Sequence, residues 1–258
     1  MDFFSACNLM AVTVRNAITP LCGTEEGGRV IGMGADGTPT KHIDKVAEDL
    51  IIAFLKEHGL CKTLISEEIG RISIGGEKGT IFLDPVDGTY NAVMNIPFYA
   101  LSIAYAEEGK ILRAFVRNLA TGETFTAEKG SGAFLNGSQI HISPTSDLQT
   151  SAMSIYGKHF QQDRIFNLMQ KIRRFRQFGA SALEISYVAA GRIDGFVDLR
   201  KTLRVTDAAA GVLICEEAGG LVTDLDGRAI VFADEVTIGT CLIATNGHLH
   251  RKVIEYLR

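Results

Sequence analysis

Two aspartates lie three residues apart in the segment GTIFLDPVDGTYN, residues 79–91. The run before Asp84 is apolar at consecutive positions, which is the pattern of a strand that helices cover on both faces. Pro85 has no N–H to donate, so we expect the strand to end there and the chain to turn. The turn brings Asp87 into the same space as Asp84, at the carboxyl end of a buried strand.

Two carboxylates this close repel each other unless a cation or a proton separates them. Hard carboxylate oxygens are the ligands that Mg²⁺ prefers, so the pair indicates a magnesium site. Gly88 and Thr89 follow at the start of a predicted short helix, where backbone N–H groups can hold a phosphate. The alternative is that Asp84 and Asp87 only form a turn and a helix cap, which is a common use of aspartate.

Two further acidic segments favour the metal interpretation. LISEE places Glu67 and Glu68 at the end of another predicted strand, and RVTDAAAG places Asp207 at the start of a helix. Each has an ordinary explanation, a solvated pair for the glutamates and the helix dipole for Asp207. Acidic groups at the ends of three separate elements are better explained by one shared site.

The composition excludes some classes of protein. The 258 residues carry a net charge of −4, whereas binding to nucleic acid needs a basic surface. The N-terminus lacks the basic region and cleavage site of a secretory signal, and the longest clean apolar run, LIIAFL, is too short to span a membrane. The five cysteines are odd in number and scattered, which indicates reduced thiols in a cytoplasmic protein.

Periodicity and turn signals divide the chain into distinct regions. Residues 2–18 and 43–59 have helical spacing, and Pro20 and Gly59 end the two patterns. Between them, residues 19–40 contain six glycines and two prolines, so we expect a mobile loop without regular structure.

The rest of the chain alternates in two different ways. Residues 99–140 read as an antiparallel meander, and after Pro144 strands alternate with helices. We therefore expect an α/β (α+β) fold in two subdomains, residues 1–142 with the loop and the metal motifs, and residues 143–258 with the substrate residues and Asp207.

Three segments resemble the signature motifs of the inositol monophosphatase superfamily. DPVDGTYN resembles its Asp-Pro-x-Asp-Gly-Thr-x-Asn signature, SEE its upstream glutamate pair, and TDAAAG its Asp-x-Ala-Ala-Gly element. The segment GADGTPTKHIDK most resembles archaeal-type members, some of which hydrolyse both inositol phosphates and fructose 1,6-bisphosphate. The resemblance implies a layered αβαβα sandwich, a homodimer, and phosphate release by direct attack of a metal-activated water.

The resemblance also implies roles for particular residues. Two or three Mg²⁺ ions, or Mn²⁺ as a substitute, would be held by Glu67, Asp84, the carbonyl of Val86, Asp87 and Asp207. Catalysis would involve Glu67, with Asp44 and Thr89 orienting the attacking water. A simpler explanation for Asp44 is a carboxylate at a helix N-terminus. Many members carry Trp where this chain has Thr206, whose hydroxyl we expect to cap the helix.

Substrate contacts are expected on both sides of the metals. The candidates are Asp87, Gly88, Thr89, Arg176, Ser181 and Arg200, with Tyr156 and Asp198 behind them. An arginine suits a second phosphate because its guanidinium can bind in two places, and an acidic residue suits sugar hydroxyls. Both types are present, which favours broad specificity for inositol 1-phosphate, fructose 1,6-bisphosphate or both.

Three alternatives stay open. Haloacid-dehalogenase-type phosphatases also have an Asp-rich motif, but one residue separates their aspartates and the first is a nucleophile, whereas two residues intervene here. A nucleotide 3′-phosphatase of the same superfamily would use the same metal ligands. A non-catalytic metal or phosphate sensor would retain the fold without releasing phosphate.

Overall fold

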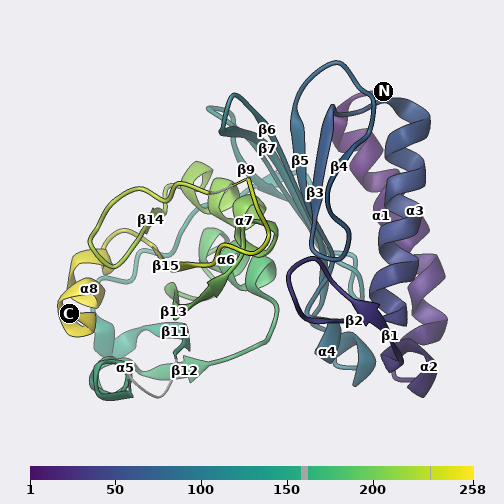
Figure 1. The fold of residues 1–258 in the computed structure, drawn as a ribbon. Coiled ribbons are helices and arrows are strands. Elements are labelled where there is room, and N and C mark those ends of the chain that lie inside the picture. The colour runs from purple at the N-terminus through teal and green to yellow at the C-terminus, as the bar shows by residue number, and fades with distance from the viewer. Residues whose placement is uncertain (158–161, 233) are drawn as a thin grey trace.

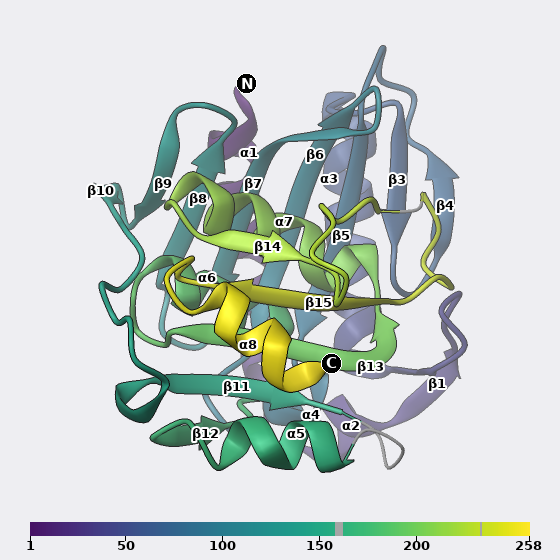
Figure 2. The same cartoon turned by 90° about the vertical axis from the view of Figure 1, so that its left-hand side faces the viewer.

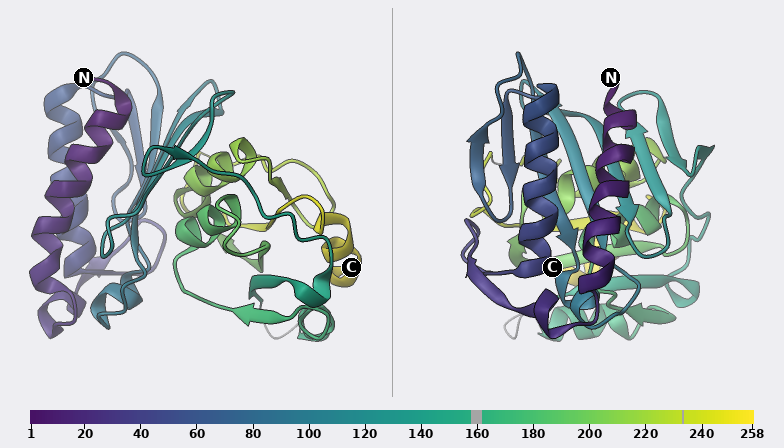
Figure 3. Two further views of the ribbon diagram at one scale, coloured as in Figure 1. Left: turned by 180° about the vertical axis from the view of Figure 1, so that it is seen from behind. Right: turned by 90° about the vertical axis from the view of Figure 1, so that its right-hand side faces the viewer.

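The molecule has five layers in a computed structural model that describes residues 1–157, 162–232 and 234–258. Helices α1 (Phe3–Ile18) and α3 (His42–His58) cover the outer face of an eight-stranded sheet, and they lie side by side in Figure 3. Helices α6 (Ser181–Ala189) and α7 (Val205–Glu217) fill the space between this sheet and a five-stranded one (Figure 1). Helices α5 (Gln162–Met169) and α8 (His250–Leu257) form the last layer. The expected αβαβα sandwich is confirmed.

The eight-stranded sheet has the order β10-β9-β8-β7-β6-β5-β3-β4. Its only parallel pair among the described residues is β3 with β5, and β6 to β10 form the predicted antiparallel meander. The strands are β3 (Thr63–Ser66), β4 (Gly70–Ser73), β5 (Thr80–Asp87), β6 (Ala100–Glu107), β7 (Lys110–Asn118), β8 (Thr124–Glu128), β9 (Gly132–Leu135) and β10 (Ser138–Gln139).

The five-stranded sheet has the order β12-β11-β13-β15-β14. Figure 2 shows its strands running across those of the larger sheet behind it. The strands are β11 (Ala152–Tyr156), β12 (Arg174–Arg176), β13 (Gly195–Leu203), β14 (Leu221–Thr223) and β15 (Thr240–Thr245), with a 3₁₀ turn at Leu148–Thr150 before β11. The short strand β14 was not expected from the sequence.

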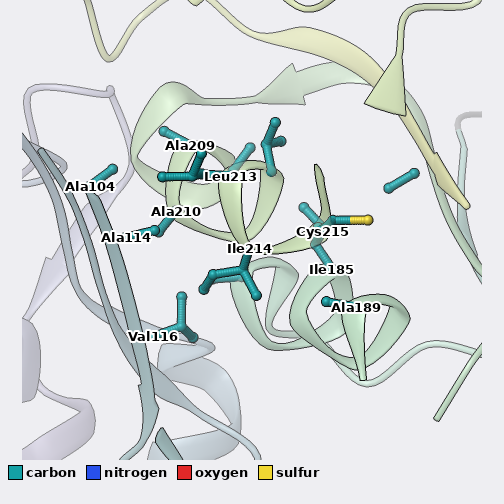
Figure 4. Close-up of a cluster of buried hydrophobic side chains, with 14 of the residues drawn as sticks. Ala104, Ala114, Val116, Ile185, Ala189, Ala209, Ala210, Leu213, Ile214 and Cys215 are labelled. Carbon is teal, nitrogen blue, oxygen red and sulfur yellow. The ribbon is translucent and has the colours of Figure 1, made fainter. Parts of the chain in front are cut away.

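The space between the sheets is filled by small and branched side chains. Ala104, Ala114 and Val116 of the larger sheet face Ala210 and Ile214 of α7 (Figure 4). Because alanines line both surfaces, α7 approaches the sheet closely, and its N-terminus lies near the end of β5. Residues of both predicted subdomains share this core, so the boundary at residues 142 and 143 stays a prediction.

Two local expectations were wrong. The segment 19–40 is not structureless: it contains a 3₁₀ turn (Thr19–Leu21), α2 (Glu25–Gly28) and a hairpin of β1 (Val30–Met33) with β2 (Pro39–Lys41). Strand β5 does not end at Asp84 but continues to Asp87, with a shift of register against β6 between these residues. The irregularity accommodates Pro85, which has no N–H for the ladder. In the described part of the chain, no helix is long and apolar enough to cross a membrane.

Candidate active site

Strand register brings the first two acidic segments together. Because β3 and β5 are parallel, with Ser66 opposite Leu83, both end at the same edge of the sheet. Glu67 follows β3 there, and its N–H donates to the carbonyl of Leu83 at 3.3 Å. Asp207 arrives from the first turn of α7. One carboxylate oxygen from each of Glu67, Asp84 and Asp207 lies within 4.8 Å of the other two.

Asp87 lies beside this acidic cluster and is held by the next helix. The N–H groups of Ser181 and Ala182, at the start of α6, donate to its two carboxylate oxygens at 3.0 and 2.7 Å. Asp84 accepts from the N–H of Val86 at 3.0 Å. Both aspartates are therefore fixed by backbone N–H groups, Asp84 by its own strand and Asp87 by the start of α6.

Gly88 makes the sharp turn from β5 into α4 (Thr89–Val93), with φ at +92°. A Cβ at this position would lie 3.0 Å from the Cβ of Ala180 and 3.1 Å from the carbonyl oxygen of Phe98. The positive φ and the crowding together require glycine.

The cluster concentrates buried negative charge. Burial raises the pKa of Glu67 to about 8, with Arg204 opposing and Asp207 adding to the shift. Burial, Glu67 and Asp87 raise the pKa of Asp84 well above its usual range. The pKa of Asp87 is raised by burial and by Asp207. The protein alone thus disfavours ionisation of these groups, and a bound cation would reverse that preference.

Arg204 places its guanidinium among these carboxylates. Its Nη1 lies 2.7 Å from Glu67 and also contacts Asp36, and its Nη2 lies 3.0 Å from Asp207. Burial acts to lower the pKa of Arg204, but Asp207 and Glu67 hold it above the ordinary value. In this structure, the positive charge among the carboxylates is therefore the guanidinium of Arg204.

Asp44 is connected to the pocket through the hydroxyl of Thr89. Thr89 Oγ1 donates to Asp44 Oδ1 at 2.8 Å and lies 3.1 Å from the carbonyl oxygen of Val86. Asp44 also accepts from the N–H of Lys41 at the start of α3, so it is at once a helix-terminal carboxylate and a partner of Thr89. Burial raises the pKa of Asp44 to about 7, while the bond from Thr89 opposes the rise.

The acidic cluster forms one wall of a pocket of about 470 Å³. Nine of the predicted site residues line it: Glu67, Asp84, Val86, Asp87, Gly88, Thr89, Ser181, Arg200 and Asp207. Asp44 lies behind Thr89 and does not itself line the pocket.

Arg176 is not among the residues that line the pocket; it is exposed at the end of β12, and its Nη1 donates to the carbonyl of Phe175 at 2.8 Å. Asp198 is fully buried, and Arg200 holds it through Nε at 3.1 Å and Nη2 at 2.6 Å. The Arg200 guanidinium carbon also lies 4.4 Å from the centre of the Tyr156 ring. A role for Asp198 in binding sugar hydroxyls has no support from this geometry, because its carboxylate is already paired and inaccessible.

Sequence reasoning did not select the other charged residues that line this pocket: Asp36, Lys201 and Arg204. Asp36 lies in the glycine-rich segment, where it accepts from the N–H of Thr38 at 2.9 Å. Its position in GADGTPT, with an acidic residue between two glycines, was the only sequence signal. Lys201 has a φ of +61°, which is unusual for a residue other than glycine.

One neighbouring prediction was wrong, and one unassigned residue now has a partner. Thr206 does not cap α7, because the cap residue is Arg204, and the Thr206 hydroxyl instead lies 3.2 Å from Asp207 Oδ1. Glu68, whose role was unassigned, accepts a hydrogen bond from the hydroxyl of Thr40 and so connects the β3–β4 turn to β2.

The donor set fits a divalent cation. The three clustered groups offer hard oxygen ligands and are close enough to share one ion, and the ion pairs of Arg204 reach Glu67 and Asp207 but not Asp84. No cysteine or histidine belongs to the cluster that the described residues form, so a hard cation is favoured over a softer transition metal.

Comparison with known proteins agrees with this geometry. The model of the inositol monophosphatase family matches residues 6–258. The chain is 47% identical to a fructose-1,6-bisphosphatase/inositol-1-monophosphatase of Methanothermobacter thermautotrophicus over 96% of this chain and 94% of the relative. It is 38% identical to a bifunctional NADP phosphatase/NAD kinase of Methanococcus maripaludis, over 98% of this chain and 49% of the relative.

Among solved structures, an inositol monophosphatase–fructose 1,6-bisphosphatase superposes with a TM-score of 0.93 at 30% identity, covering 100% of both chains. The family model, the relatives and the superposition all extend over nearly the whole chain. The chain therefore belongs to the inositol monophosphatase family.

Proposed function

We propose that the protein is a divalent-metal-dependent phosphatase that hydrolyses inositol 1-phosphate, fructose 1,6-bisphosphate or both. The observation that carries the proposal is the convergence of Glu67, Asp84 and Asp207 at one wall of the pocket. The names of the archaeal relatives support the same activity and these substrates.

Mg²⁺ is the proposed cofactor, in two or three ions, with Mn²⁺ as a substitute. Glu67, Asp84 and Asp207 would hold the first ion, and Asp87 and the carbonyl of Val86 would complete the set. When bound, the ions would neutralise the phosphate and lower the pKa of a water that attacks phosphorus directly.

Thr89 and Asp44 are proposed to orient that water. The Thr89 hydroxyl donates a hydrogen bond to Asp44, so the Thr89 oxygen can accept a hydrogen bond from a water in the pocket. Because the pKa of Asp44 is raised to about 7, its protonation state changes near neutral pH, where a general base is most effective.

The phosphate is proposed to lie against the start of α4. The N–H groups in the first turn of a helix have no partner within the helix, so those following Gly88 can bind phosphate oxygens. Ser181 and Arg200 line the opposite side of the pocket and are proposed to contact the sugar, or the second phosphate of a bisphosphate. Arg200 suits this second role better than Arg176, which lies outside the pocket.

The assembly and the compartment are also proposals. We place the protein in the cytoplasm, because the five cysteines of the sequence are all unpaired and reducing compartments keep thiols in that state. We further propose a homodimer, since twofold symmetry is the commonest arrangement of soluble oligomers.

A phosphate-release panel with titrated Mg²⁺ tests the function. The panel contains inositol 1-phosphate, fructose 1,6-bisphosphate, a nucleoside 3′-phosphate and NADP, the last because of the Methanococcus maripaludis relative. We expect Mg²⁺-dependent release from one or both of the first two. Preferred release from NADP or the 3′-phosphate would replace the proposed substrate class, and Mg²⁺-dependent binding without release would indicate a sensor.

A further inference from the structure

Four consecutive backbone N–H groups at the start of α6 are divided between two buried carboxylates. Those of Ser181 and Ala182 donate to Asp87, at 3.0 and 2.7 Å. Those of Gly179 and Ala180 point at Glu184 Oε1, at 2.9 and 3.4 Å. Glu184 thus turns back onto the start of its own helix and holds the two residues immediately before the pair that grips Asp87.

Glu184 is itself held from a different element. It is fully buried, and it accepts hydrogen bonds from the hydroxyls of Ser154 and Tyr156, both on β11. The Tyr156 bond measures 2.6 Å, and the same hydroxyl lies 2.9 Å from the N–H of Gly179. Burying a carboxylate costs free energy unless hydrogen-bond donors surround it. The four donors around Glu184 therefore indicate that its carboxylate has a specific role.

The Glu184 node is defined as Ser154, Tyr156, Gly179, Ala180 and Glu184. It is connected both to the side of the pocket that carries Asp87 and to the side that carries Arg200. Through the start of α6 it sets the direction of the N–H groups that orient Asp87. Through the Tyr156 ring, which lies 4.4 Å from the guanidinium carbon of Arg200, it supports the side chain proposed to meet the substrate. Packing alone would be served equally well by an apolar side chain at the position of Glu184.

We infer that Glu184 is a positioning residue for metal binding: by fixing the Gly179–Ala180 turn, it aligns the Ser181 and Ala182 N–H groups that orient Asp87 toward the cation. The inference rests on the proposed function, since it takes Asp87 to be a metal ligand. Groups that orient metal ligands typically contribute about 10-fold to 100-fold to metal affinity.

Calorimetric titration of the full chain with Mn²⁺, without substrate, tests the inference. Glu184→Gln keeps the shape of the side chain but removes its charge, and it places an NH2 group against the Ser154 hydroxyl or against the three donors that meet at Oε1. We expect Mn²⁺ affinity to fall about 10-fold or more. Ser154→Ala, which removes one donor and leaves the buried carboxylate in place, should lower the affinity by a smaller factor.

Asp194→Asn is the matched control. Asp194 is another buried carboxylate, it accepts from the Ser143 hydroxyl at 2.5 Å and from the Ala152 N–H at 2.7 Å, and neither partner lines the pocket. We expect its variant to lose stability in the thermal unfolding of the metal-free protein while Mn²⁺ affinity is unchanged.

The outcomes separate the inference from the proposed function. If wild type binds Mn²⁺ and releases phosphate, but Glu184→Gln and Ser154→Ala bind Mn²⁺ as wild type does, Glu184 is merely structural and the inference is overturned. If Glu184→Gln does not fold, unchanged affinity in Ser154→Ala overturns it in the same way. Failure of wild type to bind Mn²⁺ would overturn the proposed function, and the inference with it.

Discussion

Two walls of the same pocket hold opposite charges in different ways. The carboxylate wall, defined as Glu67, Asp84, Asp87 and Asp207, is fixed by strand register and backbone N–H groups. The cationic wall is defined as Arg200, Lys201 and Arg204. The first two lie in the last part of β13, and Arg204 is the N-cap residue of α7. The two arginines of this wall are paired with carboxylates of the protein.

The difference shows how the fold prepares each wall for its ligand. Burial, and after it the neighbouring carboxylates, raise the pKa values of Glu67, Asp84 and Asp87, so the wall favours a bound cation. The arginines already have partners, so an anionic substrate has to compete with Asp198 for Arg200. The cation site thus gathers several carboxylates, whereas the two arginines of the cationic wall start in ion pairs with the protein.

Removing one charge from the carboxylate wall should have the largest effect. Asp87→Asn places an amide where the Ser181 and Ala182 N–H groups require an acceptor, and it removes a proposed metal ligand. We expect Mg²⁺-dependent phosphate release to fall roughly a thousandfold, equivalent to several kcal/mol of transition-state stabilisation. Circular dichroism should show a folded protein. Retention of more than about a tenth of wild-type activity would contradict the assignment of Asp87.

Removing the cation that lies among the carboxylates should act in the opposite direction. Arg204→Met leaves Glu67 and Asp207 without their guanidinium partner. We expect Mn²⁺ affinity, measured by calorimetry without substrate, to rise roughly tenfold because no fixed positive charge competes with the ion. The metal-free protein should unfold at a lower temperature.

Arg200→Met is the matched control for Arg204, since Arg200 pairs with Asp198 and makes no ion pair with the carboxylate wall. Its Mn²⁺ affinity should stay within about twofold of wild type. Weaker Mn²⁺ binding in Arg204→Met would show that the guanidinium organises the ligands and does not compete with the ion.

The smallest expected effect concerns pH. A carboxyl group whose pKa is higher in the folded than in the unfolded state stabilises the fold fully only below its unfolded value of about 4, and this contribution is lost as pH rises through the folded value. The folded values are about 8 for Glu67 and about 7 for Asp44.

With EDTA present, we therefore expect the unfolding midpoint to fall by about 3–6 °C between about pH 5 and pH 8.5. Excess Mg²⁺ should reduce the fall, because ionised carboxylates bind the cation, so scanning calorimetry should show a larger Mg²⁺ effect at high pH. An Mg²⁺ effect that is the same at both ends of this range would refute the link between buried charge and cation binding.

The carboxylate wall could be predicted from sequence because each member lies at or near a change in periodicity. Apolar runs locate the end of β3 and the regular part of β5 up to Asp84, although β5 itself continues to Asp87, and the helical pattern locates the start of α7. Once two strands are parallel neighbours, Glu67 and Asp84 have to meet. The layered fold was predicted because the same motifs resemble the signatures of the inositol monophosphatase superfamily.

The cationic wall could not be predicted in this way. The segment DLRKTLR holds two arginines and one lysine, and no periodicity predicts which of them faces the pocket. Asp36 lies in a glycine-rich segment without periodicity, so the sequence does not predict which way its side chain points. Glu184 lies inside the apolar helical segment ALEISYVAAG, and only the turn of the chain before α6 shows why a carboxylate is buried there.

The most direct test of the central claim is an anomalous difference map from crystals soaked in Mn²⁺. The account predicts a peak within about 2.5 Å of carboxylate oxygens of Glu67, Asp84 and Asp207, with the Arg204 guanidinium moved away from Glu67. A map without a peak at these residues, in crystals where Arg204 still bridges Glu67 and Asp207, would contradict it.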